Sequence, residues 1–587
     1  MPIDGVVTRN IASELKSTLT GGKIDKVSQP ETDEVILSIR NKNENFRLLL
    51  SASPNYPRVH LTNTNKRNPI NAPMFCMVLR KHIISGKIIN IEQFNLDRII
   101  KIYIECYDDL GILSNKILTC EIMGRHSNII LIDEKSNTVV DSIKHITSDM
   151  SSFRQIMPGI AYKYPPKQDK INPLEFNCDD LMERISKNTQ DLKTEKFIAN
   201  NIEGISIFAS REIINNAGIG SGFSILNLSG EKTDALMDSV KAFIQKIIDK
   251  SFEPCIYYDD SHATDFYSFR LRYLGNFKSD SYKSISETIE KFFYNKDKAD
   301  RIKQKSADIL RVVNNNLNRC LKKLSIQKEK LLQCSSKDKW KINADLIMSN
   351  LYSIKKGDNN IKALNYFDEK GSFIDIPLDI MLTPVQNAQK YYKIYNKYKN
   401  AEKAVKVQEE ENLNEIEYFE NQLINLQNCT EDDEIEEIRN ELVSQGYIKK
   451  RKKTASRKRT QSKPLHFVSE SGTDIYVGKN NVQNDFLTFK LSNPSDIWMH
   501  TKNIPGSHVI IRTSNKAVDQ KVIIEAASLA AFYSKAKNSS NVPVDYTERK
   551  NVKKPSGAKP GMVIYYTNKT IYITPDDNVI SNMKRIE

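Results

Sequence analysis

The stretch ADILRVVNNNLNRCLKKLSIQKEKLLQC, residues 307–334, decides the fold of the middle of the chain. Its seam positions recur in alternating steps of three and four, and a later stretch repeats the pattern more weakly. The two seams are Leu310, Val313, Leu317, Cys320, Leu324, Gln327, Leu331 and Cys334, followed by Ile416, Phe419, Leu423 and Leu426. This spacing keeps one stripe of a helix against a partner helix, as in a coiled coil. We therefore expect two antiparallel helices across residues 285–443.

A non-helical insert separates the two helical arms. The segment LNYFDEKGSFIDIPLD, residues 364–379, contains Glu369, Lys370 and Gly371, which predict a hairpin turn between two short strands. The tip insert is expected at residues 358–385. At about 1.5 Å per residue, an arm of roughly 55 helical residues spans on the order of 80 Å. A lever of that length suits a protein that reaches across a large partner, and a long surface hairpin or a dimerising coil is the alternative.

The composition favours a polyanionic partner. Lys and Arg number 87 against 73 Asp and Glu, which gives a net charge of +14. Nucleic acid and an anionic membrane surface are the partners that such a balance favours. Part of the excess lies in KKRKKTASRKR, residues 449–459, within a basic linker predicted at residues 444–465. This block is either a solvated linker or an arm that contacts phosphates.

The eight cysteines are scattered singly, and no pair has C-x-x-C spacing. This pattern favours a reducing compartment and argues against both a disulfide framework and a zinc site. No apolar run reaches the length of a signal sequence or a membrane span. We expect a cytoplasmic protein with no membrane association.

The first half of the chain predicts an α+β domain followed by a helical one. Residues 1–175 alternate as antiparallel strands do, residues 256–284 are expected to return to this domain, and a helix is expected to begin after Asn71, acting as its cap. In residues 176–255, the glycine turns IEGIS and GIGSGFS suggest a helix-hairpin-helix unit that can hold a phosphate. Simple connections between helices are the alternative.

Residues 466–587 predict a compact α+β domain with a helix capped by Ser514. Trp498, His500 and Lys502 alternate on one face of a strand. A later basic loop is stiffened by Pro and Gly and contains Arg549, Lys550, Lys553, Lys554 and Lys559. Such a loop loses little entropy on binding phosphates, and aromatic side chains stack on bases. The alternative is a solvated rim loop with Trp498 in the core.

The sequence contains no recognisable catalytic motif. It has no Walker phosphate loop, no H-E-x-x-H pair and no G-x-S-x-G elbow. His500 and His508 have no Cys or carboxylate at ligand spacing, so we expect neither a metal site nor a cofactor. A binding protein is favoured over an enzyme.

Several motifs together resemble the NFACT family over essentially the whole chain. They are GKNNVQNDFLTFK (residues 478–490), DIWMHTKNIPGSHVII (496–511), VDYTERKNVKKPSGAKPG (544–561), MVLRKHI (77–83), LDR (96–98) and GRHSN (124–128). The resemblance implies a multidomain α+β fold. Its parts are an N-terminal domain similar to that of formamidopyrimidine-DNA glycosylases, a helix-hairpin-helix domain, a long antiparallel coiled-coil hairpin and a C-terminal RNA-binding domain.

The resemblance also implies a function in bacterial ribosome quality control. Family members bind large ribosomal subunits obstructed by peptidyl-tRNA and its nascent chain, and recruit alanyl-tRNA. They direct the mRNA-independent addition of a C-terminal alanine tail that marks the chain for degradation. The ribosome itself forms the peptide bonds. The implied partners are thus the large subunit, alanine tRNA and the tRNA-linked nascent chain, bound by a monomer.

By motif match, the resemblance assigns two groups of contact residues. The tRNA group is Asp97, Arg98, Gly124, Arg125, Ser127 and Asn128. The ribosome or rRNA group is Asn480, Asn481, Asn484, Asp485, Trp498, His500, Lys502, His508, Arg549, Lys550, Lys553, Lys554 and Lys559. The arginines suit phosphates and base edges. Asp97 is expected to orient an arginine or to accept from a base amine.

Departures from the family pattern limit which residue roles the NFACT resemblance implies for this sequence. Pro2 resembles the proline nucleophile of the glycosylases, but those enzymes need an acidic residue next, and Ile3 cannot serve. Lys479 stands where Arg is frequent, and Asn503 where Asp is common. Two other functions remain open: a fibronectin-binding surface adhesin, as part of the family has been named, and a general RNA-binding protein without tailing.

Overall fold

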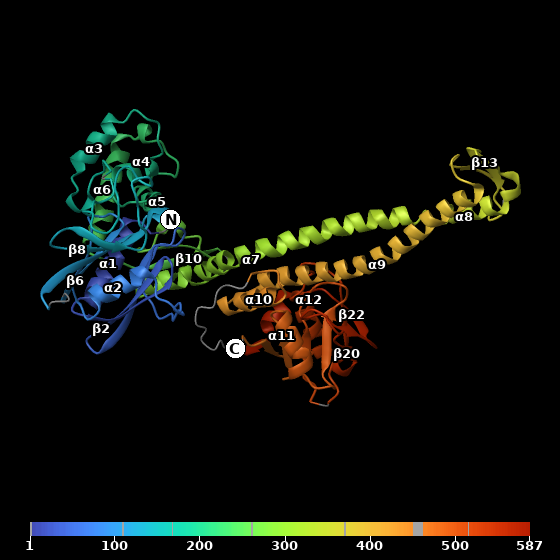
Figure 1. The fold of residues 1–587 in the computed structure, drawn as a ribbon. Helices are drawn as coiled ribbons and strands as arrows, with labels where there is room; N and C mark the ends of the chain where they lie inside the picture. Colours follow the sequence, from blue (N-terminus) through green and yellow to red (C-terminus); the bar gives the residue numbers. More distant parts are fainter. Residues whose placement is uncertain are drawn as a thin grey trace. The chain divides into compact units, whose positions relative to one another are not determined.

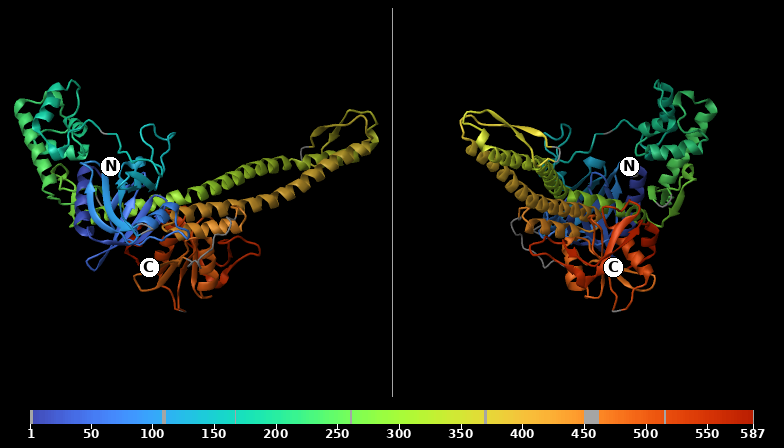
Figure 2. Two further views of the ribbon diagram at one scale, coloured as in Figure 1. Left: turned by 60° about the vertical axis from the view of Figure 1, so that its left-hand side comes forward. Right: turned by 90° about the vertical axis from the view of Figure 1, so that its right-hand side faces the viewer.

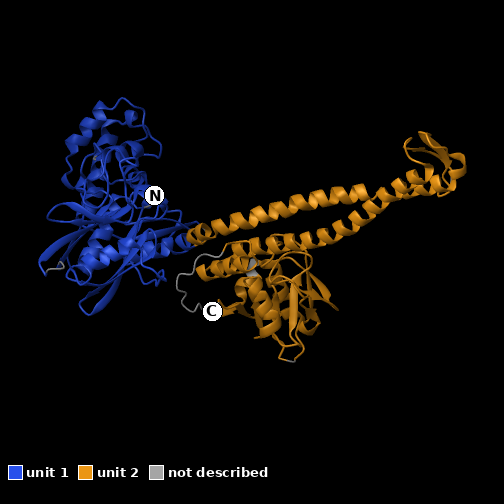
Figure 3. Ribbon diagram, viewed as in Figure 1, with its two compact units in different colours: residues 1–298 blue, residues 299–587 orange. Residues whose placement is uncertain are grey.

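The computed structural model describes residues 3–107, 111–166, 168–259, 262–368, 371–449, 462–514 and 516–586. The chain divides into two compact units, Met1–Lys298 and Ala299–Glu587, which are coloured separately in Figure 3. Pro2, the turn residues Glu369 and Lys370, and residues 450–461 of the basic linker lie outside the described residues.

The first unit is built on a large antiparallel sheet with the strand order β4-β3-β2-β1-β5-β6-β7-β8-β9. Its strands are β1 (Lys23–Glu31), β2 (Glu34–Asn41), β3 (Glu44–Ser51), β4 (Arg58–Leu61), β5 (Lys87–Gln93), β6 (Ile99–Tyr107), β7 (Leu113–Glu121), β8 (Asn128–Asp133) and β9 (Thr138–Ser142). The helices α1 (Gly5–Leu19) and α2 (Met74–Ile83) share its hydrophobic core. The expected cap of α2 was wrong, because Pro73 precedes this helix and no side chain caps it.

Helices and a smaller sheet complete the first unit. The helices are α3 (Cys178–Lys187), α4 (Thr194–Asn201), α5 (Ile207–Asn216) and α6 (Gly230–Ile248). Strands β10 (Cys255–Asp259), β11 (His262–Tyr267) and β12 (Lys278–Ser281) pair with one another rather than with the large sheet, although their buried side chains belong to the same core. The helix-hairpin-helix and glycosylase-like assignments stay predictions, as do the domain boundaries.

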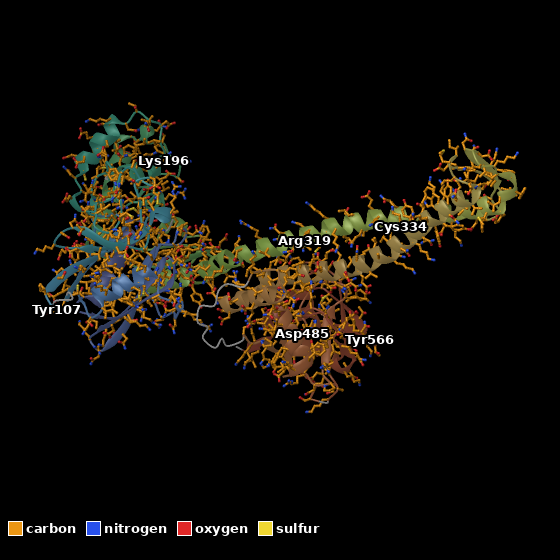
Figure 4. All side chains as sticks on the ribbon, in the orientation of Figure 1. Tyr107, Lys196, Arg319, Cys334, Asp485 and Tyr566 are labelled. Atoms are coloured by element: carbon orange, nitrogen blue, oxygen red, sulfur yellow. The ribbon has the colours of Figure 1, made fainter. Side chains whose placement is uncertain are left out.

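The second unit confirms the coiled-coil prediction. Helix α7 (Ile285–Cys334), which begins in the first unit, and α8 (Lys337–Ser349) run beside α9 (Pro384–Asn428), which is followed by α10 (Asp432–Ser444) (Figures 1 and 2). Cys320 of α7 donates to Glu415 of α9, and Gln327 of α7 accepts from Asn412 of α9, so residue numbers rise on one arm as they fall on the other. The arms are therefore antiparallel, and Arg319 and Cys334 mark α7 in Figure 4.

A hairpin caps the coiled coil, as the sequence predicted. Strands β13 (Asn360–Leu364) and β14 (Phe373–Pro377) are antiparallel. Their buried residues Ala363 and Ile376 pack with Ile347 of α8 and Ala388 of α9. The tip therefore has a small core of its own.

The C-terminal domain has a sheet in the order β22-β19-β17-β18-β16-β15-β23. Its strands are β15 (Leu465–Val468), β16 (Asp474–Val477), β17 (Ile497–Thr501), β18 (Val509–Ile511), β19 (Val542–Glu548), β22 (Lys569–Ile573) and β23 (Lys584–Ile586). Helices α12 (Gln520–Phe532) and α13 (Asp577–Asn582) belong to one core. A π-helical turn (Leu487–Leu491), which follows helix α11 (Asn481–Phe486), contributes to a second core together with the strands β20 (Val552–Lys553) and β21 (Ile564–Tyr565).

The cap of α12 differs from the expected one. Asp519 accepts a hydrogen bond from the backbone N–H of Lys521, so Asp519 and not Ser514 caps this helix. Within the described ranges, no helix is long and apolar enough to cross a membrane.

Candidate nucleic-acid interface

A cavity of about 940 Å³ in the first unit gathers most of the residues predicted to contact tRNA. Asp97 and Arg98 precede β6, whereas Arg125 and Ser127 lie between β7 and β8, and Asn128 is the first residue of β8. Ile99 pairs with Glu121 and Glu121 with Asn128, so the start of β6, the end of β7 and the start of β8 meet at one edge of the sheet. We call this space the basic cavity.

Close backbone packing forms one wall of the basic cavity. The N–H of Gly5 donates to the carbonyl of Gly204 at 2.9 Å. A Cβ on Gly204 would lie 2.3 Å from the carbonyl oxygen of Leu96, and Gly204 has a φ of +73°. Only glycine fits there, because it has no Cβ and tolerates positive φ. The IEGIS turn, the start of α1 and the Asp97 turn are thereby held together.

Asp4 fixes the start of α1 beside this wall. Its carboxylate accepts from the N–H groups of Val6 and Val7 and from the hydroxyls of Ser206 and Tyr267, at 2.6–3.0 Å. Burial raises the pKa of this carboxyl, and the four hydrogen bonds oppose the rise. Asp4 therefore serves the architecture of the cavity wall.

Asp97 holds the turn that precedes β6. Its Oδ1 accepts from the backbone N–H of Arg98 at 2.7 Å, and its own N–H donates to the carbonyl of Phe94 at 3.0 Å. Gln93 donates to the Asp97 carbonyl at 2.8 Å. The Asp97 carboxylate thus accepts from the backbone amide of Arg98, and it positions Arg98 through the turn.

Arg98 supplies positive charge to the basic cavity. Among the residues that the structure describes, no carboxylate or hydrogen-bond acceptor pairs with its guanidinium. Lys170 lines the same cavity, and its Nζ donates to the Ala199 carbonyl at 2.9 Å. Burial and then the charge of Arg98 lower the pKa of Lys170, although Glu203 and Asp97 act in the opposite direction. Two cations so close together favour a bound anion.

Sequence reasoning missed Lys170 and also Lys144, which lies in the same lining. The Lys144 ammonium donates to the Ala52 carbonyl at 2.6 Å, and burial lowers its pKa. A single lysine after a strand carries no motif, so only the fold reveals these two cations. Arg154 differs from them, because Glu121 holds its guanidinium at 2.5 and 2.7 Å.

The GRHSN turn presents Arg125 to solvent. Its Nε donates to His126 at 3.0 Å. Ser127 accepts from the Met123 N–H, and Asn128 exchanges hydrogen bonds with the backbone of Lys144. Ser127 and Asn128 are buried and use their polar groups on the backbone of Met123 and Lys144, so Arg125 is the exposed residue of the three.

Apolar side chains line the rest of the basic cavity. Phe94 and Tyr164 stack with their ring centroids 4.1 Å apart, and Lys101 lies over both rings. Met150 and Phe153 are more than half exposed. Exposed rings beside cations are the combination that unpaired bases and phosphates require.

Trp498 in the C-terminal domain is wholly buried and offers no face for stacking. It packs against Tyr565 at 4.8 Å, with His500 and His508 beside it. Burial lowers the pKa of both histidines, which favours their neutral forms. Trp498 is therefore a core residue, which was the alternative to a residue that stacks on bases. No group of three metal-ligating side chains occurs within the described ranges.

The asparagines of the GKNN motif are buried too. Asn480 caps α11 by accepting from the Gln483 N–H, and Asn484 accepts from the N–H of His508. Asn481 contacts Asn425 of α9 and Glu441 of α10. Direct contact of Asn481 with RNA would therefore require the domain to leave the coiled coil.

The other residues predicted to contact the ribosome or rRNA differ in whether their side chains already have partners within the protein. Asp485, labelled in Figure 4, pairs with Lys554 and accepts from the Gly561 N–H. Lys559 donates to the Tyr447 hydroxyl at 2.6 Å and lies over the Tyr418 ring. Arg549 donates to the Thr488 carbonyl. Lys502, Lys550, Lys553 and Lys554 are exposed.

Comparison with known proteins relates both units to one family. Residues 4–461 match the NFACT N-terminal and middle domains, and residues 463–567 match the NFACT protein RNA binding domain. The Rqc2 homolog RqcH of Bacillus subtilis is 40% identical over all of both chains, and that of Streptococcus pneumoniae serotype 2 is 33% identical over all of both. The solved N-terminal part of the fibronectin/fibrinogen-binding protein from Streptococcus suis is 29% identical, covers 50% of this chain and 99% of its own, and has a TM-score of 0.42. The chain therefore belongs to the NFACT family and carries that family's RNA-binding domain.

Proposed function

We propose that this protein is a cytoplasmic ribosome quality-control factor. It binds large ribosomal subunits obstructed by peptidyl-tRNA, recruits alanyl-tRNA and directs the addition of a C-terminal alanine tail without mRNA. The ribosome forms each peptide bond, and the protein, as a monomer, selects and positions tRNA. Similarity to the RqcH relatives along the entire chain supports this role.

The observation that carries the tRNA part of the proposal is the guanidinium of Arg98, which has no hydrogen-bond or ion-pair partner among the described residues; exposed Arg125 lines the same basic cavity. A partly buried cation without a counter-ion is costly unless a ligand supplies one. The planar guanidinium donates two parallel hydrogen bonds to a phosphate or to the edge of a guanine. The tRNA is therefore assigned to the basic cavity, where Asp97 holds the Arg98 turn.

The exposed lysines of the C-terminal domain suit contact with ribosomal RNA. Lys502, Lys550, Lys553 and Lys554 are exposed, and three of them lie in one loop stiffened by proline and glycine. Contacts from lysine to phosphates carry affinity without base specificity. The coiled coil gives the second unit the reach to contact a separate part of the large subunit.

The test is a tailing assay on obstructed large subunits with the full-length protein. Arg98→Ala is expected to abolish alanine addition while binding to the subunit persists. Arg40→Ala is the matched control, because Arg40 lies on the same sheet, is 61% exposed and pairs with Asp25 outside the cavity lining. Tailing retained by the Arg98 variant would remove the assignment of the basic cavity. Wild-type protein that binds RNA without tailing would instead indicate a general RNA-binding protein.

A further inference from the structure

Helix α10 inserts a carboxylate into a cluster of hydrogen-bond donors on the C-terminal domain. Glu437 accepts from Asn480 Nδ2 at 2.7 Å, from Ser462 N at 2.6 Å and Oγ at 2.7 Å, and from Gln483 Nε2 at 3.3 Å. Four donors around one anionic group form an oxyanion site of the kind that also holds phosphate.

Positive charges flank this site, and carboxylates of the coiled coil meet them. Lys479 pairs with Glu434 at 2.6 Å, where the two side chains are 19% and 3% exposed. Lys559 lies 3.4 Å from Glu415 of α9. The domain thus supplies cations and neutral donors, and the coiled coil supplies the anions. We call the domain side, Ser462, Lys479, Asn480, Gln483 and Lys559, the α11 face.

The anions come from one side of one helix. Glu434 and Glu437 are spaced by three residues, which places them next to each other along α10. Two neighbouring carboxylates resemble two phosphates of a nucleic-acid strand in the sign of their charge and in their capacity to accept hydrogen bonds. If α10 departed, water would replace the carboxylates at Lys479 and Asn480, whereas Gln483 would keep its hydrogen bonds to Ser462. A phosphate in place of each carboxylate would return an anionic acceptor to Lys479 and Asn480.

We propose that the α11 face is a phosphate-binding surface for RNA, and that α10 closes it as an internal mimic of the RNA backbone. RNA and α10 compete for the same donors, so RNA gains this surface only when the domain separates from α10. The inference rests on the RNA-binding role proposed above and adds a regulated site to it. The exposed lysines give RNA a first point of attachment while the α11 face is still covered.

The experiment compares the full-length protein with Glu434→Gln/Glu437→Gln by fluorescence anisotropy, using a labelled single-stranded uridine oligonucleotide at fixed salt. Glutamine keeps the shape and an acceptor oxygen but removes the charge that the α11 face holds. Affinity is expected to rise roughly tenfold, within the usual range of coupling between two sites. Glu436→Gln is the control, since Glu436 is on the same helix and pairs with Arg439.

A second variant separates competition from a merely structural contact. Addition of Lys479→Gln/Lys559→Gln to the double variant is expected to remove the gain and to lower the salt dependence, by about 0.7 in logarithmic slope for each lost phosphate contact on a single strand. Equal affinities of wild type and Glu434→Gln/Glu437→Gln would overturn the proposal, as would a gain that survives loss of both lysines. Wild-type protein without affinity for RNA would contradict the RNA-binding role itself, which distinguishes the two failures.

Discussion

The sharpest quantitative prediction concerns the buried carboxyl of Glu441 in α10. Its side chain is 4% exposed, and its Oε1 accepts from the amides of Gln422 and Asn481 at 2.6 and 3.2 Å. Burial raises the pKa of Glu441 from 4.5 to about 7, against these hydrogen bonds. Glu441→Gln should therefore remove a pH dependence from the stability of the C-terminal domain.

The sign and size of the effect follow from proton linkage. Because the folded pKa is raised, the folded state holds a proton between pH 4.5 and 7 that the unfolded state has lost. The stabilisation that this carboxyl contributes is complete below pH 4.5, falls by about 1.4 kcal/mol per pH unit between pH 4.5 and 7, and is lost above pH 7. Between pH 5.5 and pH 8 the loss due to this carboxyl is about 2 kcal/mol.

Urea unfolding followed by tryptophan fluorescence measures this loss. The chain has two tryptophans, so Trp340→Phe leaves the buried Trp498 as the reporter of the C-terminal domain. Between pH 5.5 and 8, the free energy of unfolding should fall about 2 kcal/mol more in this background than in the same background with Glu441→Gln. All other ionisable groups are the same in the two proteins, so their contributions to the pH dependence cancel in the comparison. Glu436→Gln should behave like the parent, and equal pH dependence with and without Glu441 would refute the reasoning.

Two further changes test the packing of each unit. Gly204→Ala should lower the free energy of unfolding by about 1–3 kcal/mol, because the new Cβ would lie 2.3 Å from the Leu96 carbonyl oxygen. Gly220→Ala is the control and should be near neutral, because a Cβ there has open space. Equal melting temperatures of the two variants in differential scanning calorimetry would contradict this prediction. In the coiled coil, Asn412→Leu should lower the free energy of unfolding by about 1–3 kcal/mol, because it leaves the buried amide oxygen of Gln327 without its donor. Asn412→Leu/Gln327→Leu should recover most of that stability, as measured by thermal melts followed by circular dichroism. A double variant no more stable than the single one would argue against this pair.

The coiled coil was the part of the fold that the sequence predicted best. Its seam residues Val313, Cys320, Ile416 and Phe419 are buried together in one core. A repeat of three and four residues indicates a helix with one face packed against a partner, and the insert between the two stretches favours a partner within the same chain. The tip hairpin was predicted for a similar reason, since the helical pattern stops there and a turn follows.

The C-terminal site was harder to predict because an alternating strand does not reveal what covers each face. Trp498 lies on the face covered by the π-helical turn and the β20–β21 hairpin, so a residue expected to stack on bases is a core residue. Asn480 and Asn481 are used against α10, which is distant in sequence. In the basic cavity, Lys144 and Lys170 come from loops without a motif, and only the fold brings them to Arg98.

The most direct test of the account is to purify the tagged protein gently from its own cells and to sequence the RNA that accompanies it. Wild type and Arg40→Ala should carry large-subunit RNA without matching small-subunit RNA, together with one enriched tRNA. Arg98→Ala should keep the large-subunit RNA and lose the tRNA. The same tRNA recovered with Arg98→Ala, or bulk RNA without bias in wild type, would contradict the claim that the basic cavity recruits tRNA to the large subunit.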